Sequence, residues 1–138
     1  ERPEDYQNLM DRLNKKFNTA RLHVPPPVVQ YEKGVKIGLI AFGSSHFAVC
    51  ESRNQLESAN IKTSYLRLRA LPFNDELRKF VELHERIYVV EQNRDAQMRD
   101  LIRLELPDLA MQLRSVCHYD GLPIDATFIT DAIMSDKR

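Results

Sequence analysis

The sequence predicts an α/β fold whose mainly parallel sheet is covered by helices on both faces. From residue 28 onward, short apolar segments of strand length alternate with segments whose apolar residues recur at helical spacing. Gly, Pro and Asn separate these segments, and crossovers between parallel strands are expected to be right-handed. Residues 35–42 (VKIGLIAF) form the most apolar run, so we expect this strand at the centre of the sheet.

The segment before this alternation is predicted to be a long amphipathic helix over residues 3–22. Its apolar residues fall on one face: Tyr6, Leu9, Met10, Leu13, Phe17 and Ala20. Three prolines at 25–27 then end the helix and favour a stiff, extended spacer. We therefore expect residues 1–27 to form a linker helix and Pro-rich spacer, and residues 28–138 to form a C-terminal α/β domain. The chain begins with Glu rather than Met, which we interpret as a piece of a longer protein.

The remaining elements follow from apolar periodicity and from breakers. The expected strands are residues 28–31, 35–42, 63–69, 86–92 and 115–118. The expected helices are residues 45–59, 75–85, 95–106 and 124–134. Asn74 suits the cap of the second of these helices, and Pro107 interrupts the third. We expect the third helix to bury Met98, Leu101 and Ile102.

Composition excludes several function classes. Twenty basic residues balance twenty acidic ones, so nothing favours binding to nucleic acid or an anionic membrane. No apolar run approaches the roughly 20 residues of a membrane span. Cys50 and Cys117 match no zinc or iron–sulfur spacing, and we expect two buried free thiols in a cytoplasmic protein.

Motifs that carry chemistry are missing. The sequence has no GxGxxG after its first long strand, no phosphate-binding P-loop and no GxSxG elbow. Its four histidines form no HxxxH pair: His23, His46, His84 and His118. We therefore expect no catalytic, cofactor-binding or metal-ligating residue in this chain.

Polar residues follow two of the predicted strands. In a doubly wound sheet, the carboxyl ends of such strands line a crevice at the topological switch point. One group is Gly43, Ser44, Ser45 and His46, where backbone N–H groups at a helix start attract anions. The other group is Glu91, Gln92, Asn93 and Arg94. The alternatives are a tight turn with a Ser cap and an Asn93 or Asp95 helix cap, with the rest solvated.

Two further groups are contact candidates. Arg67 and Arg69 share a strand face with Tyr65, and they either pair across an interface or extend their stems to water. His118 and Asp120 precede Gly121 in a sequence typical of a hydrogen-bonded turn.

Four runs of the sequence resemble the C-terminal region of α subunits of 2-oxoacid:ferredoxin (acceptor) oxidoreductases. They are KIGLIAFGSSHFAV (36–49), LRLRALPF (66–73), VVEQNRD (89–95) and HYDGLPID (118–125). Their order and spacing are also similar, and the resemblance covers roughly residues 3–134. The segment PEDYQNLMDRLNKKF resembles the linker helix that precedes this domain in those subunits.

The resemblance implies a fold like the transketolase C-terminal domain. That fold is a three-layer α/β/α sandwich with a five-stranded, mostly parallel sheet, in which residues 28–31 would supply the antiparallel strand. The whole enzyme of the family converts a 2-oxoacid and coenzyme A to acyl-CoA, carbon dioxide and reduced ferredoxin. It uses thiamine diphosphate, magnesium and iron–sulfur clusters.

The chain departs from the whole enzyme, because residues 119–122 (YDGL) lack the first Gly and the later Asn of the thiamine diphosphate motif. It also lacks the cluster cysteines. The resemblance thus implies a structural and assembly domain, inactive alone, that packs against the preceding domains of its subunit and the β subunit and meets ferredoxin only through the holoenzyme. Glu91, Asn93, Arg94 and His118 are the contact candidates. The alternative is a stand-alone ligand-binding or regulatory domain that uses the crevice between Gly43–His46 and Gln92–Asn93.

Overall fold

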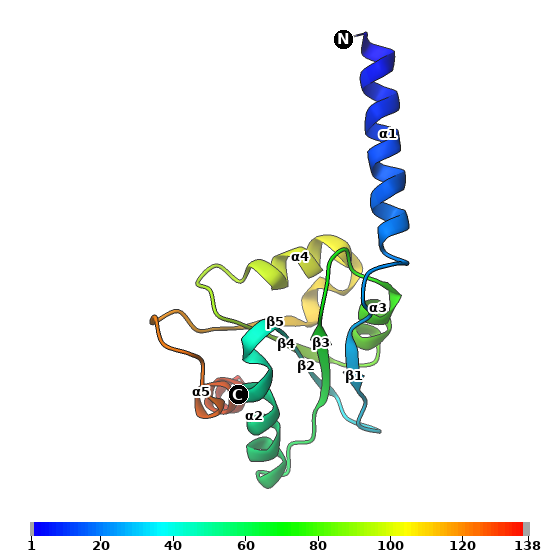
Figure 1. Ribbon diagram of the computed structural model, residues 1–138. Helices are drawn as coiled ribbons and strands as arrows, with labels where there is room; N and C mark the ends of the chain where they lie inside the picture. Colours follow the sequence, from blue (N-terminus) through cyan, green and yellow to red (C-terminus); the bar gives the residue numbers. More distant parts are fainter. Residues whose placement is uncertain (1, 137–138) are drawn as a thin grey trace.

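In the computed structural model, which describes residues 2–136, one five-stranded sheet lies between two layers of helices (Figure 1). The strand order is β1-β3-β2-β4-β5, with β1 antiparallel to β3 and the other neighbours parallel. The strands are β1 (Val28–Gln30), β2 (Ile37–Phe42), β3 (Ser64–Leu68), β4 (Arg86–Glu91) and β5 (Leu113–Cys117). The predicted sandwich, the central strand and the antiparallel edge strand are therefore confirmed.

Strand β2 forms the middle of the core. Leu39, Ile40 and Ala41 are fully buried, and Leu39 lies between Tyr65 of β3 and Tyr88 of β4 in the register. Because side chains alternate along a strand, Leu39 and Ala41 pack into one apolar cluster and Ile40 into the other. The continuous apolar run is thus explained by burial on both faces.

The helices divide between the two faces. Helices α2 (His46–Ser58) and α5 (Ala126–Ser135) cover one face, with Val49, Leu56 and Ile129 in its cluster. Helices α3 (Asp75–Glu82) and α4 (Gln97–Glu105) cover the other, together with a 3₁₀ helix, Pro107–Gln112. Asn74 caps α3 as predicted, since its side chain accepts a hydrogen bond from the Glu76 backbone.

Helix α1 (Pro3–Ala20) stands away from the sandwich, and none of its residues is buried (Figure 1). Its carboxyl end is attached by Arg21, whose guanidinium pairs with Glu105 of α4 and donates to the Phe73 carbonyl at 3.1 Å. The guanidinium also lies over the Phe17 ring, 5.7 Å from its centroid. These contacts fix the direction in which α1 leaves the domain.

Some predicted details are wrong. The first helix ends at Ala20 rather than residue 22, and β5 begins at Leu113 rather than residue 115. Leu101 is 43% exposed, because the nine-residue helix α4 fully buries only Ile102 and partly buries Met98. Cys50 and Cys117 are free, and both are half-buried rather than buried. Among residues 2–136, no helix combines the length and apolarity needed to cross a membrane.

Candidate functional site

The switch point of the sheet lies between β2 and β4. The chain leaves β2 toward β3 on one side and leaves β4 toward β5 on the other, so the connections that follow β2 and β4 diverge. Gln92 joins them. Its amide nitrogen donates to the hydroxyl oxygens of Ser44 (3.0 Å) and Ser45 (3.1 Å), and its carbonyl accepts from the Ile124 backbone (3.3 Å). Sequence reasoning placed these serines opposite Gln92, and the structure brings them together.

The turn after β2 depends on Gly43, whose φ of +59° is unfavourable for other residues. The turn is a 3₁₀ segment, Gly43–Ser45, which leads directly into α2. Neither serine side chain caps α2, so the alternative of a Ser cap is wrong. The hydroxyls are held by Gln92 instead.

Glu91 is fully buried at the end of β4, and its carboxylate is used inside the domain. It accepts hydrogen bonds from the backbone nitrogens of Met98 (2.7 Å) and Arg99 (2.9 Å) and from the Asn93 side chain (2.8 Å). Helix α4 has no local side-chain cap, since its N-cap residue is Ala96 in the left-handed conformation. Glu91 therefore caps α4 and stabilises its positive end. It is not a surface contact residue.

Asn93 and Arg94 complete this loop. The Asn93 carbonyl oxygen accepts from the backbone nitrogens of Asp95 (3.1 Å) and Gln97 (3.3 Å), which holds the approach to α4. Arg94 pairs with its neighbour Asp95 at 2.7 Å, and its side chain is largely exposed. An exposed pair of this kind adds little stability, so Arg94 remains accessible to a neighbour.

An open hollow of about 370 Å³ lies over these strand ends. Phe42, Met98 and Leu101 supply its apolar lining. Its remaining lining comes from Gly43 and from hydroxyl and amide side chains: Ser44, Ser45, Gln92, Asn93 and Gln97. A smaller hollow of about 200 Å³ adjoins it and shares Phe42, Gly43 and Met98. No titratable side chain lines the larger hollow, so these residues can form hydrogen bonds but cannot exchange protons.

His46 does not line this hollow. Its Nδ1 lies 3.0 Å from the Tyr65 hydroxyl, on the sheet face covered by α2 and α5. Desolvation and the nearby Arg67 charge lower the pKa of His46, while burial raises the pKa of Tyr65 to about 12. Both groups are therefore neutral near pH 7, which favours donation from the Tyr65 hydroxyl to His46.

The remaining sequence candidates lie apart from the larger hollow. Arg67 is half-buried, and Arg69 is exposed with a long hydrogen bond to the Pro26 carbonyl (3.5 Å). His118 is 8% exposed; its Nε2 lies 3.3 Å from Asp120, and its ring meets the edge of Phe128. His118 and Asp120 thus close a turn, as the sequence indicated.

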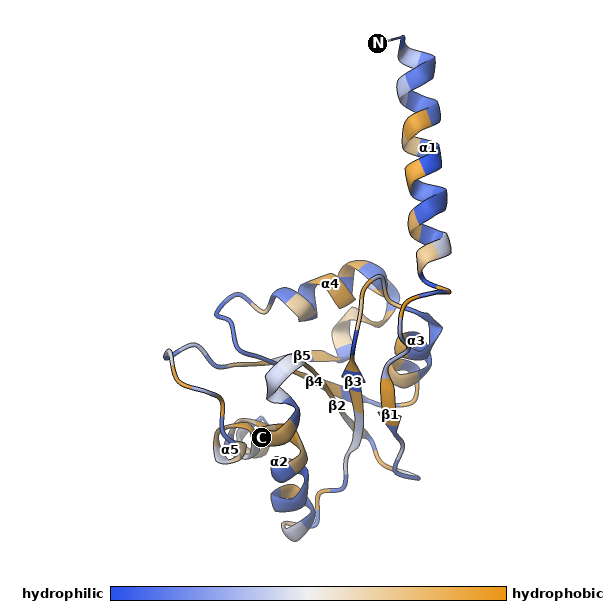
Figure 2. Cartoon of the chain, viewed as in Figure 1, coloured by the Kyte–Doolittle hydropathy of each residue, from blue (hydrophilic) through white to orange (hydrophobic). Residues whose placement is uncertain are grey.

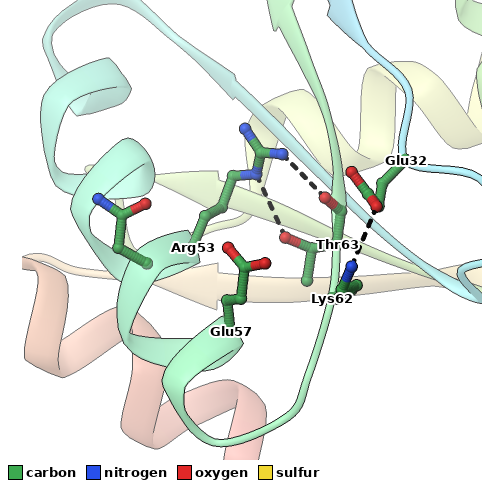
Figure 3. Close-up of a pocket in the computed structure, with 6 residues that line it drawn as sticks. Glu32, Arg53, Glu57, Lys62 and Thr63 are labelled. Atoms are coloured by element: carbon green, nitrogen blue, oxygen red, sulfur yellow. Dashed lines mark hydrogen bonds and ion pairs between the residues drawn. The ribbon is translucent and has the colours of Figure 1, made fainter.

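Sequence reasoning missed Arg53, which organises a small hollow of about 90 Å³ at the amino end of β3 (Figure 3). Its guanidinium donates to the Thr63 hydroxyl (3.2 Å), to the Thr63 carbonyl (2.9 Å) and to the Gln30 side chain. Beside it, Lys62 and Glu32 pair at 3.4 Å. Arg53 thus connects α2 to β1 and to the residue that precedes β3. A lone arginine on a predicted helix gives no sequence signal for such a role.

The fold matches domains of known oxidoreductases and transketolases. A 2-oxoglutarate:ferredoxin oxidoreductase from Magnetococcus marinus, solved with 2-oxoglutarate, coenzyme A and succinyl-CoA bound, aligns over 99% of this chain with a TM-score of 0.84 and 19% identity. A split-gene transketolase, described as an inactive β4 tetramer, aligns over 81% (42% of that chain; TM-score 0.67; 17% identity). The α chain of a probable 2-oxoacid ferredoxin oxidoreductase from Thermoplasma acidophilum aligns over 80% (96% of that chain; TM-score 0.54; 20% identity).

These likenesses establish the fold, since all three identities are low. This chain spans only 24% of the Magnetococcus enzyme chain. Helix α1 contributes 18 of the 138 residues, so an alignment over 99% of the chain includes it. No family model and no curated protein matches the sequence.

Proposed function

We propose that this chain is the C-terminal structural and assembly domain of the α subunit of a 2-oxoacid:ferredoxin oxidoreductase. The observation that carries the proposal is the match over the whole chain, α1 included, to part of a 2-oxoglutarate:ferredoxin oxidoreductase. The whole enzyme would convert a 2-oxoacid, coenzyme A and oxidised ferredoxin to acyl-CoA, carbon dioxide and reduced ferredoxin. Residues 1–27 would act as the linker and residues 28–138 as the packing domain.

The chemistry at the switch point supports a structural role. Gln92 holds the two serines and the loop before α5, and Glu91 holds the start of α4. The hydrogen bonds of these groups fix the strand ends and the helix starts. Thiamine diphosphate, magnesium and iron–sulfur clusters would lie in the preceding domains of the subunit and in the β subunit.

Two exposed features would make the contacts. One is the apolar face of α1, and the other is the loop that carries Arg94. Arg69 lies exposed beside the smaller hollow and would contribute a charge at the same edge of the sheet. A rigid sandwich with these surfaces can position neighbouring domains without reacting itself.

Calorimetry tests whether the cofactor site lies outside this chain. Titration of thiamine diphosphate with magnesium into the chain should give no saturable heat. Saturable binding at micromolar affinity would overturn the proposal, because the cofactor site would then lie within this chain. The parent enzyme containing its other domains serves as the positive control.

A second candidate function rests on the hollow of about 370 Å³ at the switch point. A stand-alone ligand-binding domain would be stabilised by small anions or nucleotides through mass action, which a thermal shift would detect. Ser44→Ala combined with Gln97→Ala should abolish that shift, since both residues line the hollow. A shift that persists unchanged would exclude this site.

A further inference from the structure

The sheet face that carries α2 and α5 is covered only in part. These two helices pack together over an apolar cluster that contains residues of β2, β3, β4 and β5. Among residues 2–136, no β1 residue belongs to that cluster, and Val28 of β1 is 44% exposed. On the opposite face β3 is well covered, because Leu66 and Leu68 pack into the cluster beneath α3. One edge of the sandwich therefore lacks a helix in one of its two layers.

The uncovered edge carries arginines around one apolar side chain. We call it the β1–β3 strip and define it by Val28, Arg53, Arg67 and Arg69. Val28 is paired with Arg67 in the antiparallel register, so their side chains are neighbours on the same face. The Arg53 guanidinium lies over the Tyr65 ring, 5.7 Å from its centroid, which places it on this face too. Figure 2 shows the hydrophobic strand β1 beside β3, in which hydrophilic and hydrophobic positions alternate.

The three arginines of the strip form no ion pair with any of residues 2–136. Arg53 donates to uncharged groups of β1 and of the residue before β3 (Figure 3), and Arg69 donates to a backbone carbonyl. Glu32 and Glu57 line the small hollow beside Arg53, but neither pairs with it. Every other arginine between residues 28 and 136 does pair with a carboxylate: Arg78, Arg86, Arg94, Arg99, Arg103 and Arg114.

The exception of these three arginines indicates missing partners. Arg53 and Arg67 are half-buried, and Arg69 is exposed. A guanidinium stays charged at every physiological pH and is the preferred cation for pairing with carboxylates at protein interfaces. Three unpaired guanidiniums on one uncovered sheet face therefore point to carboxylates supplied from outside this chain.

The dimensions of the strip fit a helix. Two neighbouring strands span about 10 Å, which is the diameter of one helix with its side chains. Arg67 and Arg69 are two residues apart, or about 6.6 Å along extended chain, and carboxylates four residues apart on a helix are about 6 Å apart. From Thr63, which holds Arg53, to Arg69 the distance along extended chain is about 20 Å. A small anion would meet only one end of such a strip, whereas a helix of three to four turns would follow all of it.

We propose that an acidic helix of a neighbouring domain lies along the β1–β3 strip in the assembled enzyme. Its carboxylates pair with Arg67 and Arg69, and an apolar side chain of the same helix packs on Val28. Arg67 is the central contact, because it is already half-buried and has Val28 beside it. The helix completes the layer that α2 and α5 leave unfinished, and its cover strengthens the ion pairs by removing water from them.

This inference rests on the proposed assembly role and names the chemistry of one contact in it. The two fail in different ways. If the wild-type chain does not bind the parent oxidoreductase prepared without this segment, both are wrong. If it binds and substitutions in the strip leave the affinity unchanged, only the acidic helix is wrong.

Carbodiimide crosslinking of the assembled parent enzyme identifies the partner. Arg67→Lys keeps the positive charge and supplies an amine that the reagent joins to a carboxylate in direct contact. Peptide mapping should find position 67 joined to an Asp or Glu in a helix of a neighbouring domain. Lys36 and Glu85, whose Nζ and Oε1 atoms lie 2.8 Å apart, are the internal control for the reaction. The proposal is wrong if the control pair is joined and position 67 is not, or if position 67 is joined only to a second copy of this chain.

Affinity measurements test the charge. Binding of the chain to the parent oxidoreductase prepared without this segment is followed by calorimetry. Arg67→Glu should weaken binding by about thirtyfold or more, since it removes a covered ion pair and opposes like charges. Arg69→Glu should weaken binding less, because Arg69 is exposed. Lys33→Glu makes the same change of charge at an exposed position before β2 and should bind like the wild type.

Two further readouts complete the test. Thermal unfolding of the chain with Arg67→Glu should stay close to that of the wild type, because no ion pair within residues 2–136 is lost. Equal affinities for Arg67→Glu and Lys33→Glu would overturn the proposal. So would a thermal shift of the wild-type chain with pyrophosphate that Arg67→Glu abolishes, because the strip would then hold a small anion instead of a helix.

Discussion

The carboxylate of Glu91 lies 2.7 Å from the backbone nitrogen of Met98, and it supplies the cap that helix α4 lacks in its own sequence. The same side chain accepts from Arg99 and from Asn93, so its fully buried oxygens are satisfied by three donors at a helix start. This contact connects the end of β4 to α4 and fixes one wall of the switch-point hollow.

Glu91→Ala should lower the free energy of unfolding by about 3 kcal/mol, because two helix N–H groups would lose their buried partner. Glu91→Gln should cost about half as much, since one amide oxygen remains to accept. Chemical denaturation measures both. Glu82→Ala, which removes an exposed carboxylate paired with Arg78, should cost less than about 0.5 kcal/mol and is the control. Equal losses for Ala at 91 and at 82 would show that the cap is unimportant.

Gly38 and Gly43 should both resist substitution, for different reasons. A Cβ at Gly38 would lie 2.7 Å from Ile87 Cδ1 and 2.8 Å from the Phe80 ring, so Gly38→Ala should cost about 1–3 kcal/mol through overpacking. A Cβ at Gly43 would meet nothing within 4 Å, so Gly43→Ala should cost about 1 kcal/mol through its positive φ alone.

One matched variant for each glycine separates overpacking at Gly38 from the positive φ at Gly43 in denaturation experiments. Ile87→Val removes the clashing Cδ1 and should recover part of the loss in Gly38→Ala. Gly43→Asn should be milder than Gly43→Ala, because Asn tolerates the left-handed region. The account of either glycine is wrong if its matched variant has no such effect.

His84 should make stability depend on pH. Burial lowers the pKa of His84 in the folded state below its usual 6.5, and its Nδ1 contacts the Phe80 carbonyl at 2.6 Å. The unfolded chain therefore binds more protons near and below pH 6.5. Stability should be full above this pH and should fall as the pH drops toward the folded-state pKa.

Urea denaturation across this range gives the measurement. His84→Gln should flatten the dependence, although His46, whose pKa is also lowered, keeps part of it. His23→Gln at an exposed position is the control for replacing a histidine with glutamine. An unaltered slope in His84→Gln would rule out His84 as the source.

The order of the elements was predicted well from the sequence. Strand β2 and its neighbours are buried, and this burial appears in the sequence as uninterrupted apolar runs. Gln92 and the two serines were also placed together correctly, since the carboxyl ends of neighbouring parallel strands lie at the same edge of the sheet. Leu101 was misplaced, because helical spacing alone does not say how narrow a face a short helix buries.

Two parts of the site were beyond sequence reasoning. His46 was grouped with Ser45, but the rotation of about 100° per residue in a helix turns it away from the hollow and against Tyr65. The Glu91 cap depends on Ala96 in a left-handed conformation, which nothing about an alanine indicates. Both features arise from backbone geometry rather than from residue type.

Restoration of activity in trans tests the assembly role most directly. The parent oxidoreductase is prepared without this segment, and the chain is added back while 2-oxoacid- and coenzyme A-dependent ferredoxin reduction is followed. An assembly domain should raise activity from background to a plateau at one chain per truncated subunit, and the chain alone should give none. Turnover by the chain alone, or full activity of the truncated enzyme without it, would contradict the proposed role.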